Sequence, residues 1–349
     1  MTHWIDRQVL DCSEPDRQFH LLARQNELCQ YHFDHCQPYR WLLGTRPQHC
    51  SAMEDVPWLT ARLFKRFDIT SVDSNSVTRT ITSSGTSGVQ PSRAHLDMAT
   101  ANNQSRVLVK TLQTILGRPR RRVIFFEPKT PTFQNGLSAR LAGVMGIGLF
   151  AREMIFLQTE RGGWDWSIWE SLCRESSSEE CVFFGFTFSV WQFLQEMAEQ
   201  GFQSDFSHSV LLHTGGWKKL ERLAVSNSSF KSRVSATLGI ERVHNFYGMA
   251  EQAGSVFPEC VDGNLHCTAF NHVIVRNPST LAPMQNGKNG VVQVFSAIPE
   301  SYPGHSLLTE DQGYVIADDG CSCGWRGRYF RIIGRLPDAE VRGCSDVRA

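Results

Sequence analysis

The chain has 349 residues, of which 41% are hydrophobic, and its 35 basic residues balance 35 acidic ones, so its formal net charge is zero. This composition excludes a generally disordered chain, and the balanced charge gives no bulk attraction to nucleic acids or acidic membranes. Because no apolar run approaches ~18 residues and the first residues are polar, we expect no membrane span, no secretory signal and a cytoplasmic location. In such a reducing compartment the 11 cysteines indicate metal binding or catalysis rather than disulfides.

The first 75 residues carry scattered apolar positions typical of helices, and we expect a short helix between Val56 and Phe67. Beyond residue 77 the pattern changes to short apolar runs, typical of strands, separated by helical stretches. The expected strands are 123–126, 182–186, 210–213 and 243–246, and the expected helices are 97–116, 189–201 and 217–238. Strands that alternate with helices indicate a mostly parallel sheet in an α/β domain.

After about residue 270 the apolar runs are separated by Gly, Asn and Pro turns, which is typical of antiparallel strands. The expected strands in this part are 273–275, 291–295 and 313–316. The sequence therefore predicts an α/β fold in three parts. These parts are a helical segment over 1–75, an α/β core over 76–270 and a β-rich subdomain over 271–349.

A segment rich in glycine and hydroxyl residues follows the strand-like residues 77–81. Glycines let a backbone approach phosphate oxygens closely, and hydroxyl and N–H groups donate hydrogen bonds to those oxygens. No Gly-Lys-Ser/Thr sequence closes the segment, so it is not a P-loop, and a flexible surface turn is the alternative interpretation. The candidate phosphate-binding residues are Ser83, Ser84, Gly85, Thr86, Ser87 and Gly88.

A second segment places an aromatic ring, an amide and a carboxylate directly after a strand. The ring of Tyr247 can stack on a nucleobase, Asn245 can read the edge of the base, and Glu251 can hold Mg²⁺ near phosphates. An ordinary turn at the end of a strand is the alternative. Two further features lie downstream. Asp311 lies beside an expected turn, where its carboxylate could accept hydrogen bonds from ribose hydroxyls, and residues 334–335 form a Gly-Arg pair near the end of the sequence.

These four features, in this order, resemble the core motifs of the adenylate-forming enzymes, the superfamily of acyl-CoA synthetases and firefly luciferase. Residues 83–88 resemble the phosphate loop, and residues 247–251 resemble the Tyr-Gly-x-Thr-Glu motif. Asp311 is similar to the ribose-binding aspartate, and residues 334–335 are similar to the start of the hinge. The resemblance implies ATP and Mg²⁺ as cofactors, nucleotide binding by Asn245, Tyr247, Gly248 and Asp311, and catalysis by Glu251 and Arg335.

The resemblance narrows to the acyl-protein synthetase (LuxE-like) family, the fatty-acid-activating partner in bacterial bioluminescence, and covers roughly residues 50–349. The matching segments are 56–59 (Val-Pro-Trp-Leu), 63–65 (Leu-Phe-Lys), 184–188 (Phe-Gly-Phe-Thr-Phe), 213–218 (His-Thr-Gly-Gly-Trp-Lys) and 341–345 (Val-Arg-Gly-Cys-Ser). The resemblance implies the large N-terminal domain of adenylate-forming enzymes, with layered parallel and mixed sheets. It also implies that Gly215, Gly216 and Trp217 lie along the adenine, and that Phe186 and Thr187 lie near the acid.

Two features depart from the superfamily pattern. Ala250 replaces a hydroxyl residue that many members use at the α-phosphate, which leaves that contact to residues 83–87 or to Arg335. The chain also stops shortly after the hinge motif, so we expect the mobile C-terminal domain of ~100 residues, which carries the adenylation lysine in the superfamily, to be absent.

Two cysteine-rich segments, 260–267 and 321–324, suggest a metal site. Zn²⁺ prefers four nitrogen or sulfur ligands in a tetrahedron, and two paired turns supply them at a low cost in chain entropy. Relatives that include phenylacetate-type CoA ligases show a similar Cys…His…Cys-x-Cys arrangement, whereas four free thiols on neighbouring loops are the alternative. By that likeness we expect a structural Zn²⁺ on Cys260, His266, Cys321 and Cys323, with Cys267 as the alternative fourth ligand.

Cys344 has arginines around it, and nearby positive charge favours the nucleophilic thiolate. A thiolate is suited to accept an acyl group from a mixed anhydride. In the acyl-protein synthetase family a cysteine near the C-terminus is the acylated residue, and Cys344 is the matching position. An inert thiol in a frayed tail is the alternative.

Together these features predict an AMP-forming acid–thiol ligase. It would activate a fatty or related carboxylate with ATP as an acyl-adenylate, transfer the acyl group to Cys344, and deliver it to an acyl-accepting protein such as a reductase or carrier protein. Two alternatives stay open: transfer to coenzyme A or a carrier-protein thiol with Cys344 as a bystander, and a nucleotide-binding scaffold without turnover.

Overall fold

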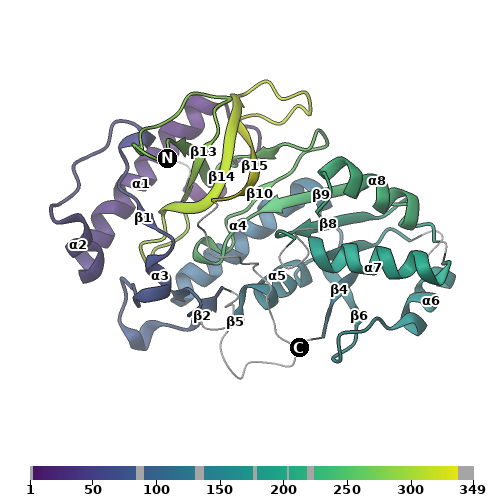
Figure 1. Ribbon diagram of the computed structural model, residues 1–349. Coiled ribbons are helices and arrows are strands. Elements are labelled where there is room, and N and C mark those ends of the chain that lie inside the picture. The colour runs from purple at the N-terminus through teal and green to yellow at the C-terminus, as the bar shows by residue number, and fades with distance from the viewer. Residues whose placement is uncertain are drawn as a thin grey trace.

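The computed structural model describes residues 3–83, 90–129, 137–175, 179–202, 204–217 and 224–336. Figure 1 shows a parallel sheet flanked by helices, an antiparallel sheet beside the N-terminal helices, and a small third sheet. Within these residues no helix combines the length and the apolar character needed to cross a bilayer.

The parallel sheet has the strand order β10-β9-β8-β7-β4-β6, and only β10 runs antiparallel to its neighbour. Its strands are β4 (Arg121–Pro128), β6 (Ala151–Gln158), β7 (Val182–Phe186), β8 (Val210–Thr214), β9 (Arg242–Tyr247) and β10 (Phe257–Pro258). Every residue of β7 and β8 is buried, as expected for parallel strands covered on both faces.

Two layers of helices cover the faces of this sheet, because alternate residues of a strand point to opposite sides. The helices are α4 (Met98–Leu116), α5 (Ala139–Gly148), α6 (Trp166–Glu175), α7 (Thr187–Gln200) and α8 (Asn227–Leu238). Ile124 and Phe126 of β4 pack with apolar side chains of α6, α7 and α8. Val123 and Phe125 pack with α4 and α5 on the other face.

The second large sheet has the order β11-β15-β14-β13-β12, and β1 joins it by running parallel to β14. Its strands are β1 (Leu59–Thr60), β11 (Leu265–His266), β12 (Asn271–Arg276), β13 (Gly290–Ser296), β14 (Ser306–Asp318) and β15 (Arg328–Arg335). Helix α1 (Glu14–His35) covers this sheet, since Leu21 and Cys29 share an apolar cluster with Ile274 and Phe295.

The third sheet has the order β3-β2-β5, in which β2 and β3 precede the parallel sheet along the chain and β5 lies between β4 and β6. Its strands are β2 (Arg79–Thr82), β3 (Arg93–Leu96) and β5 (Leu137–Ser138). The short helices in the first 76 residues are η1 (Trp4–Asp6), α2 (Gln37–Leu43), η2 (Met53–Asp55), α3 (Leu63–Arg66) and η3 (Ser74–Ser76). Strand β2 ends immediately before the glycine-rich segment, so this sheet anchors the predicted phosphate loop.

The predicted strands of the α/β core and the antiparallel strands beyond residue 270 are confirmed. The predicted helix 217–238 corresponds to α8, which begins at Asn227, while residues 218–223 lie outside the described part. Two local predictions are wrong. The segment 56–67 is not one helix, because Leu59–Thr60 pairs with β14 and only Leu63–Arg66 is α-helical. Asp311 does not lie beside a turn but inside β14.

The buried histidines His32 and His305 should make the folded protein less stable in mild acid. The rings of His32 and His305 stack with centroids 4.9 Å apart in the interior, and burial lowers the pKa of both, to about 3 for His305. The unfolded chain takes up protons below about pH 6.5 while the folded chain resists them, so stability falls as the pH drops below this value. We expect a decrease of up to ~1.4 kcal/mol per pH unit for each ring, measured by urea unfolding between about pH 6.5 and 5.

The comparison for this prediction is His305→Gln, whose side chain does not titrate in this range. Its unfolding free energy should depend less steeply on pH than that of the wild type. Equal slopes for the two proteins would show that His305 makes no contribution.

Candidate active site and metal centre

A cavity of about 760 Å³ is lined by residues at the ends of β7, β8 and β9 and by residues of β14 and β15. The carboxyl ends of parallel strands commonly form ligand sites in α/β folds, and this volume is typical of a small-molecule site. The predicted residues that line the cavity are Ser83, Gly215, Gly216, Trp217, Asn245, Tyr247, Gly248, Glu251, Asp311 and Arg335. The predicted residues outside the described part of the chain are Ser84, Gly85, Thr86, Ser87, Gly88 and Cys344.

Asp311 is the centre of a hydrogen-bonded group at the cavity. Its carboxylate accepts from Tyr247 Oη at 2.6 Å and from Arg335 Nε at 3.2 Å. The pairing of β14 with β15 places Asp311 directly opposite Arg335, and a terminal nitrogen of Arg335 also lies 3.6 Å from a carboxylate oxygen of Glu310. Strands β14 and β15 therefore hold the Asp311 carboxylate, which can accept hydrogen bonds from sugar hydroxyls, beside the Arg335 guanidinium, which can face phosphate.

Glu251 lies in the short helix η5 (Ala250–Gln252) and is 6% exposed. Burial raises the pKa of its carboxyl, and the nearby Arg335 opposes that effect. A hard cation favours the ionised form of such a carboxylate, and carboxylates are the ligands that Mg²⁺ prefers. Glu251 therefore fits a Mg²⁺ site at the cavity.

Ser83 and Ser92 hold together the two ends of the glycine-rich segment. The N–H of Ser92 donates to Ser83 Oγ at 2.9 Å, and the N–H of Ser83 donates to the carbonyl of Ser92 at 3.1 Å. Ser83 lines the cavity, so these two hydrogen bonds fix the start of the predicted phosphate loop beside the cavity.

The loop after β8 is shaped by Gly215. Its φ of +77° is in the left-handed region, and a Cβ there would lie 3.1 Å from the ring of Phe186, so a larger residue would be strained. The hydroxyl of Thr187 lies 2.7 Å from the carbonyl of Gly215 and can donate to it, which fixes the loop to α7. Asn245 lines the same cavity, and its Oδ1 has no partner among the described residues.

The sequence did not point to Lys65 as a site residue. Lys65 lines the cavity with a side chain that is only 13% exposed, and its Nζ lies 3.8 Å from Glu310 Oε2. The parallel pairing of β1 with β14 brings α3 beside Glu310. The available signal was the lysine within the family-like segment 63–65, but a strand of two residues is too short to be read from a pattern.

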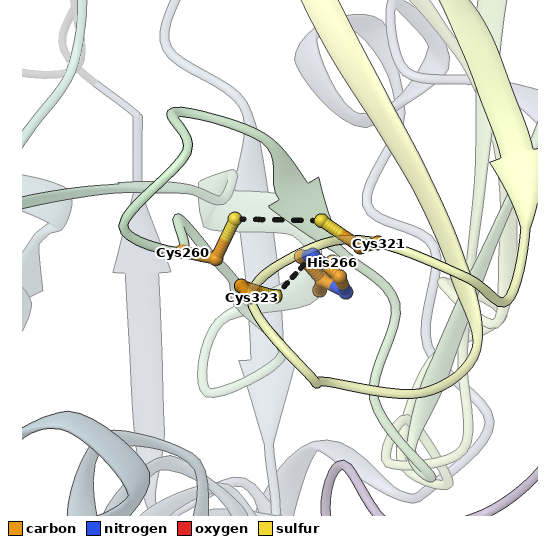
Figure 2. Close-up of side chains that lie close together, drawn as sticks. All are labelled: Cys260, His266, Cys321 and Cys323. Atoms are coloured by element: carbon orange, nitrogen blue, oxygen red, sulfur yellow. Dashed lines mark hydrogen bonds between the residues drawn. The ribbon is translucent and has the colours of Figure 1, made fainter.

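The four predicted metal ligands form one cluster, drawn in Figure 2. Their ligand atoms all lie within 4.8 Å of one another, with Cys260 Sγ 3.9 Å from Cys321 Sγ and Cys323 Sγ 3.6 Å from His266 Nε2. Two sulfurs on one tetrahedral Zn²⁺ lie ~3.8 Å apart if each Zn–S bond is ~2.3 Å, so these residues fit zinc. Cys267 packs instead in the apolar core.

The protonation states of this cluster depend on its burial. Burial raises the pKa of the Cys260 and Cys323 thiols, to about 12 for Cys323, and lowers the pKa of His266 to about 4. Neutral imidazole is the form of histidine that binds metal, whereas cysteine binds as the thiolate. A bound cation would supply the positive charge that stabilises the thiolates, and its binding would release their protons.

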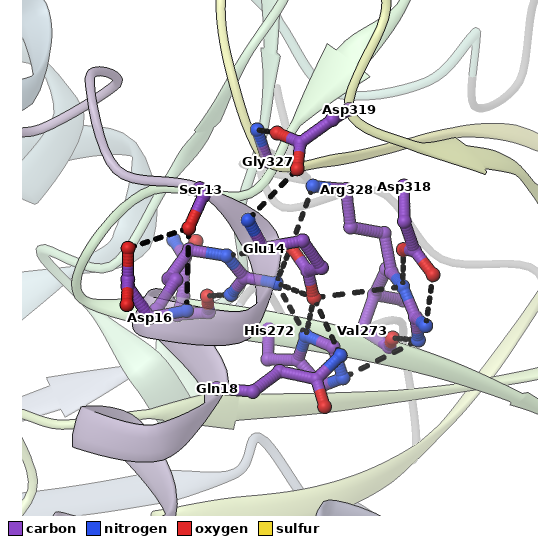
Figure 3. A network of polar contacts seen from close by, with 12 residues as sticks. Ser13, Glu14, Asp16, Gln18, His272, Val273, Asp318, Asp319, Gly327 and Arg328 are labelled. Carbon is purple, nitrogen blue, oxygen red and sulfur yellow. Dashed lines mark hydrogen bonds and ion pairs between the residues drawn. The ribbon is translucent and has the colours of Figure 1, made fainter.

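A polar network fixes the loop that carries Cys321 and Cys323, as Figure 3 shows. Asp319 accepts from the N–H of Gly327 at 2.5 Å and from the N–H of Glu14, at the start of α1, at 3.0 Å. The Glu14 carboxylate accepts from the N–H of Arg328 at 2.7 Å. Both ends of the loop are therefore tied to each other and to α1.

A sequence model of the family described as "Acyl-protein synthetase, LuxE" matches residues 5–349. The chain belongs to the acyl-protein synthetase (LuxE) family. Two LuxE-type relatives are named long-chain-fatty-acid–luciferin-component ligase. The protein of Vibrio harveyi is 24% identical over 153 residues, which are 43% of this chain and 39% of the relative. The protein of Aliivibrio fischeri is 21% identical over 174 residues, 49% of this chain and 46% of the relative. The matches thus span less than half of each relative.

Solved structures show that the fold of this LuxE family member is that of the adenylate-forming enzymes. A 2-hydroxyisobutyryl-CoA ligase in complex with 2-HIB-AMP superposes with a TM-score of 0.73 at 18% identity, covering 95% of this chain and 70% of the ligase. ATP-bound MatB from Rhodopseudomonas palustris gives 0.50 at 16% identity, covering 76% and 49%. The predicted fold class and family are therefore confirmed.

Proposed function

We propose that this chain activates a carboxylic acid, fatty or related, with ATP and then carries the acyl group as a thioester on Cys344. The observation that carries the proposal is that Asn245, Tyr247, Glu251, Asp311 and Arg335 line one cavity at the ends of the parallel strands. The names of the relatives from Vibrio harveyi and Aliivibrio fischeri support a long-chain fatty acid as the substrate.

In the first step a carboxylate oxygen of the acid attacks the α-phosphorus of ATP. The bond from that phosphorus to the bridging oxygen breaks, and pyrophosphate leaves. Positioning and charge neutralisation make up most of the protein's contribution to such a reaction. Asp311 would hold the ribose, and Arg335 and Lys65 would face the phosphates. Glu251 would hold Mg²⁺, which supplies positive charge at the phosphates.

In the second step the thiolate of Cys344 attacks the acyl carbon. The bond from the acyl carbon to the phosphate oxygen breaks, and AMP leaves. A thioester then carries the acyl group to an accepting protein such as a reductase or carrier protein. The cysteine and histidine cluster would hold a structural Zn²⁺ with all four positions filled by the protein, so it takes no part in this chemistry.

ATP–pyrophosphate exchange with a panel of fatty acids tests the first step, and labelled acid tests the second. We expect exchange with wild type and with Cys344→Ser, and acyl label only on proteins that keep Cys344. Cys173→Ser, which changes a half-buried thiol on α6, is the matched control and should be labelled like the wild type.

Each other outcome contradicts one part of the proposal. Label that persists on Cys344→Ser identifies another acceptor. Release of AMP only when coenzyme A is added makes coenzyme A the acceptor. ATP binding without exchange, for every acid tried, favours a nucleotide-binding scaffold.

A further inference from the structure

The metal cluster lies where the two large sheets meet. Cys260 follows β10 of the parallel sheet, whereas His266 lies in β11 of the antiparallel sheet. Cys321 and Cys323 come from the loop between β14 and β15 (Figure 2). The loop from β10 to β11 is therefore held by ligands near both of its ends, and this same loop lines the cavity through Asp262.

Hydrogen bonds extend this connection from the cluster into the cavity wall. Ser322 Oγ donates to Asp262 Oδ2 at 2.8 Å. Asn264 Nδ2 lies 3.6 Å from Cys321 Sγ, and Arg331, which also lines the cavity, donates from Nε to Asn264 Oδ1 at 3.1 Å. A displacement of Cys321 therefore acts on cavity residues in the loop between β10 and β11 and in β15.

Cys260 and Cys321 can be metal ligands or disulfide partners, but not both at once. Their sulfurs lie 3.9 Å apart, close to the ~3.8 Å expected for two thiolates on one zinc ion. A disulfide requires an S–S distance of ~2.05 Å, so oxidation must draw the sulfurs together by ~1.9 Å. The metal would lose two ligands, and the two loops would have to move.

We propose that Cys260 and Cys321 form an oxidation-sensitive pair, whose disulfide releases the metal, deforms the cavity wall at Asp262 and weakens nucleotide binding. Hydrogen peroxide is the oxidant. Cys321 is the more exposed residue of the pair, 8% against 0% for Cys260, and its sulfur attacks a peroxide oxygen. The O–O bond breaks, water leaves, and a sulfenic acid forms. The sulfur of Cys260 then attacks that sulfur, the S–O bond breaks, and a second water leaves. Two thiols thus lose two hydrogens as one peroxide becomes two waters.

The inference rests on the proposed nucleotide site, and zinc-loaded wild-type protein tests it. Peroxide should release about one zinc per chain to a chromophoric chelator. Peptide mapping should find Cys260 linked to Cys321, with the mass lowered by two hydrogens. The Kd for ATP, measured by calorimetry, should rise about tenfold, and dithiothreitol with added zinc should restore it.

Two variants separate this pair from the other thiols. Cys173→Ser should respond to peroxide as the wild type does, whereas Cys321→Ser should give no cross-link to Cys260. A disulfide between another pair would overturn the assignment of Cys260 and Cys321. A Cys260–Cys321 disulfide with an unchanged Kd would overturn the coupling. If reduced wild type binds no ATP, the proposed function fails, but zinc release and peptide mapping still test the pair.

Discussion

Replacing Lys65 with methionine should slow ATP–pyrophosphate exchange by ~100-fold or more, the size of effect seen when one group that stabilises transition-state charge is removed. Methionine keeps most of the length and apolar volume of the side chain and removes the charge. Lys65 Nζ lies 3.8 Å from Glu310, and Glu310 also lies beside Arg335, so the two cations share one carboxylate at the cavity. With triphosphate in the cavity, both cations would face its negative charge.

Lys288→Met is the matched control, because Lys288 is exposed in the turn between β12 and β13 and away from the cavity lining. Its exchange rate should equal that of the wild type. Lys65→Arg keeps the charge and should retain part of the activity. Unchanged exchange in Lys65→Met, with the fold intact by circular dichroism, would remove Lys65 from the proposed mechanism.

Removing the proposed Zn²⁺ should lower the melting temperature by ~5 °C. A ligand at about 1,000 times its Kd stabilises the folded state by ~4 kcal/mol, and the entropy of unfolding of a chain this size converts that to a few degrees. The expectation follows from the four ligands, which join the loop between β10 and β11 to the loop between β14 and β15. Elemental analysis of the purified protein should find about one zinc per chain.

The measurement is thermal unfolding with and without a strong chelator, and with zinc added back. Cys260→Ser should have the lower melting temperature both with and without chelator, whereas Cys173→Ser should behave as the wild type. A melting temperature that is the same with and without bound zinc would show that the cluster does not stabilise the fold.

The alternation of apolar runs with helical stretches was sufficient to predict β4, β7, β8 and β9 of the parallel sheet, because the central strands are buried on both faces and leave a continuous apolar signature. Strand β6 at the edge of the sheet was not predicted, and most of its residues are not buried. The motif residues on the parallel strands meet in the structure because loops that follow neighbouring parallel strands share one edge of the sheet. Asn245 and Gly215, for example, lie after or near the ends of adjacent strands and line the same cavity.

The errors arose where the composition of a segment is compatible with two different local structures. Asp311-Gln312-Gly313 has the composition of a turn, yet it continues β14. Gly313 is required there because a Cβ would clash with the carbonyl oxygen of Arg331 on the adjacent strand, a close approach that a single sequence does not reveal. Lys65 was overlooked because its position depends on a long-range strand pairing. Leu59–Thr60 pairs with Leu307 and Leu308, which lie almost 250 residues away in the sequence.

The contacts between α1 and the loop that carries Cys321 and Cys323 also determine when this protein can finish folding during synthesis. Glu14 bonds to Asp319 and Arg328 across 305 and 314 residues of sequence. A ribosome must therefore make nearly the whole described chain before α1 meets its last polar partners, and the apolar face of α1 stays uncovered until Ile274 and Phe295 of the antiparallel sheet have been made. Such long separations slow folding and prolong the exposure of apolar surface. Helix α1 is thus made early and is among the last elements to gain its final contacts.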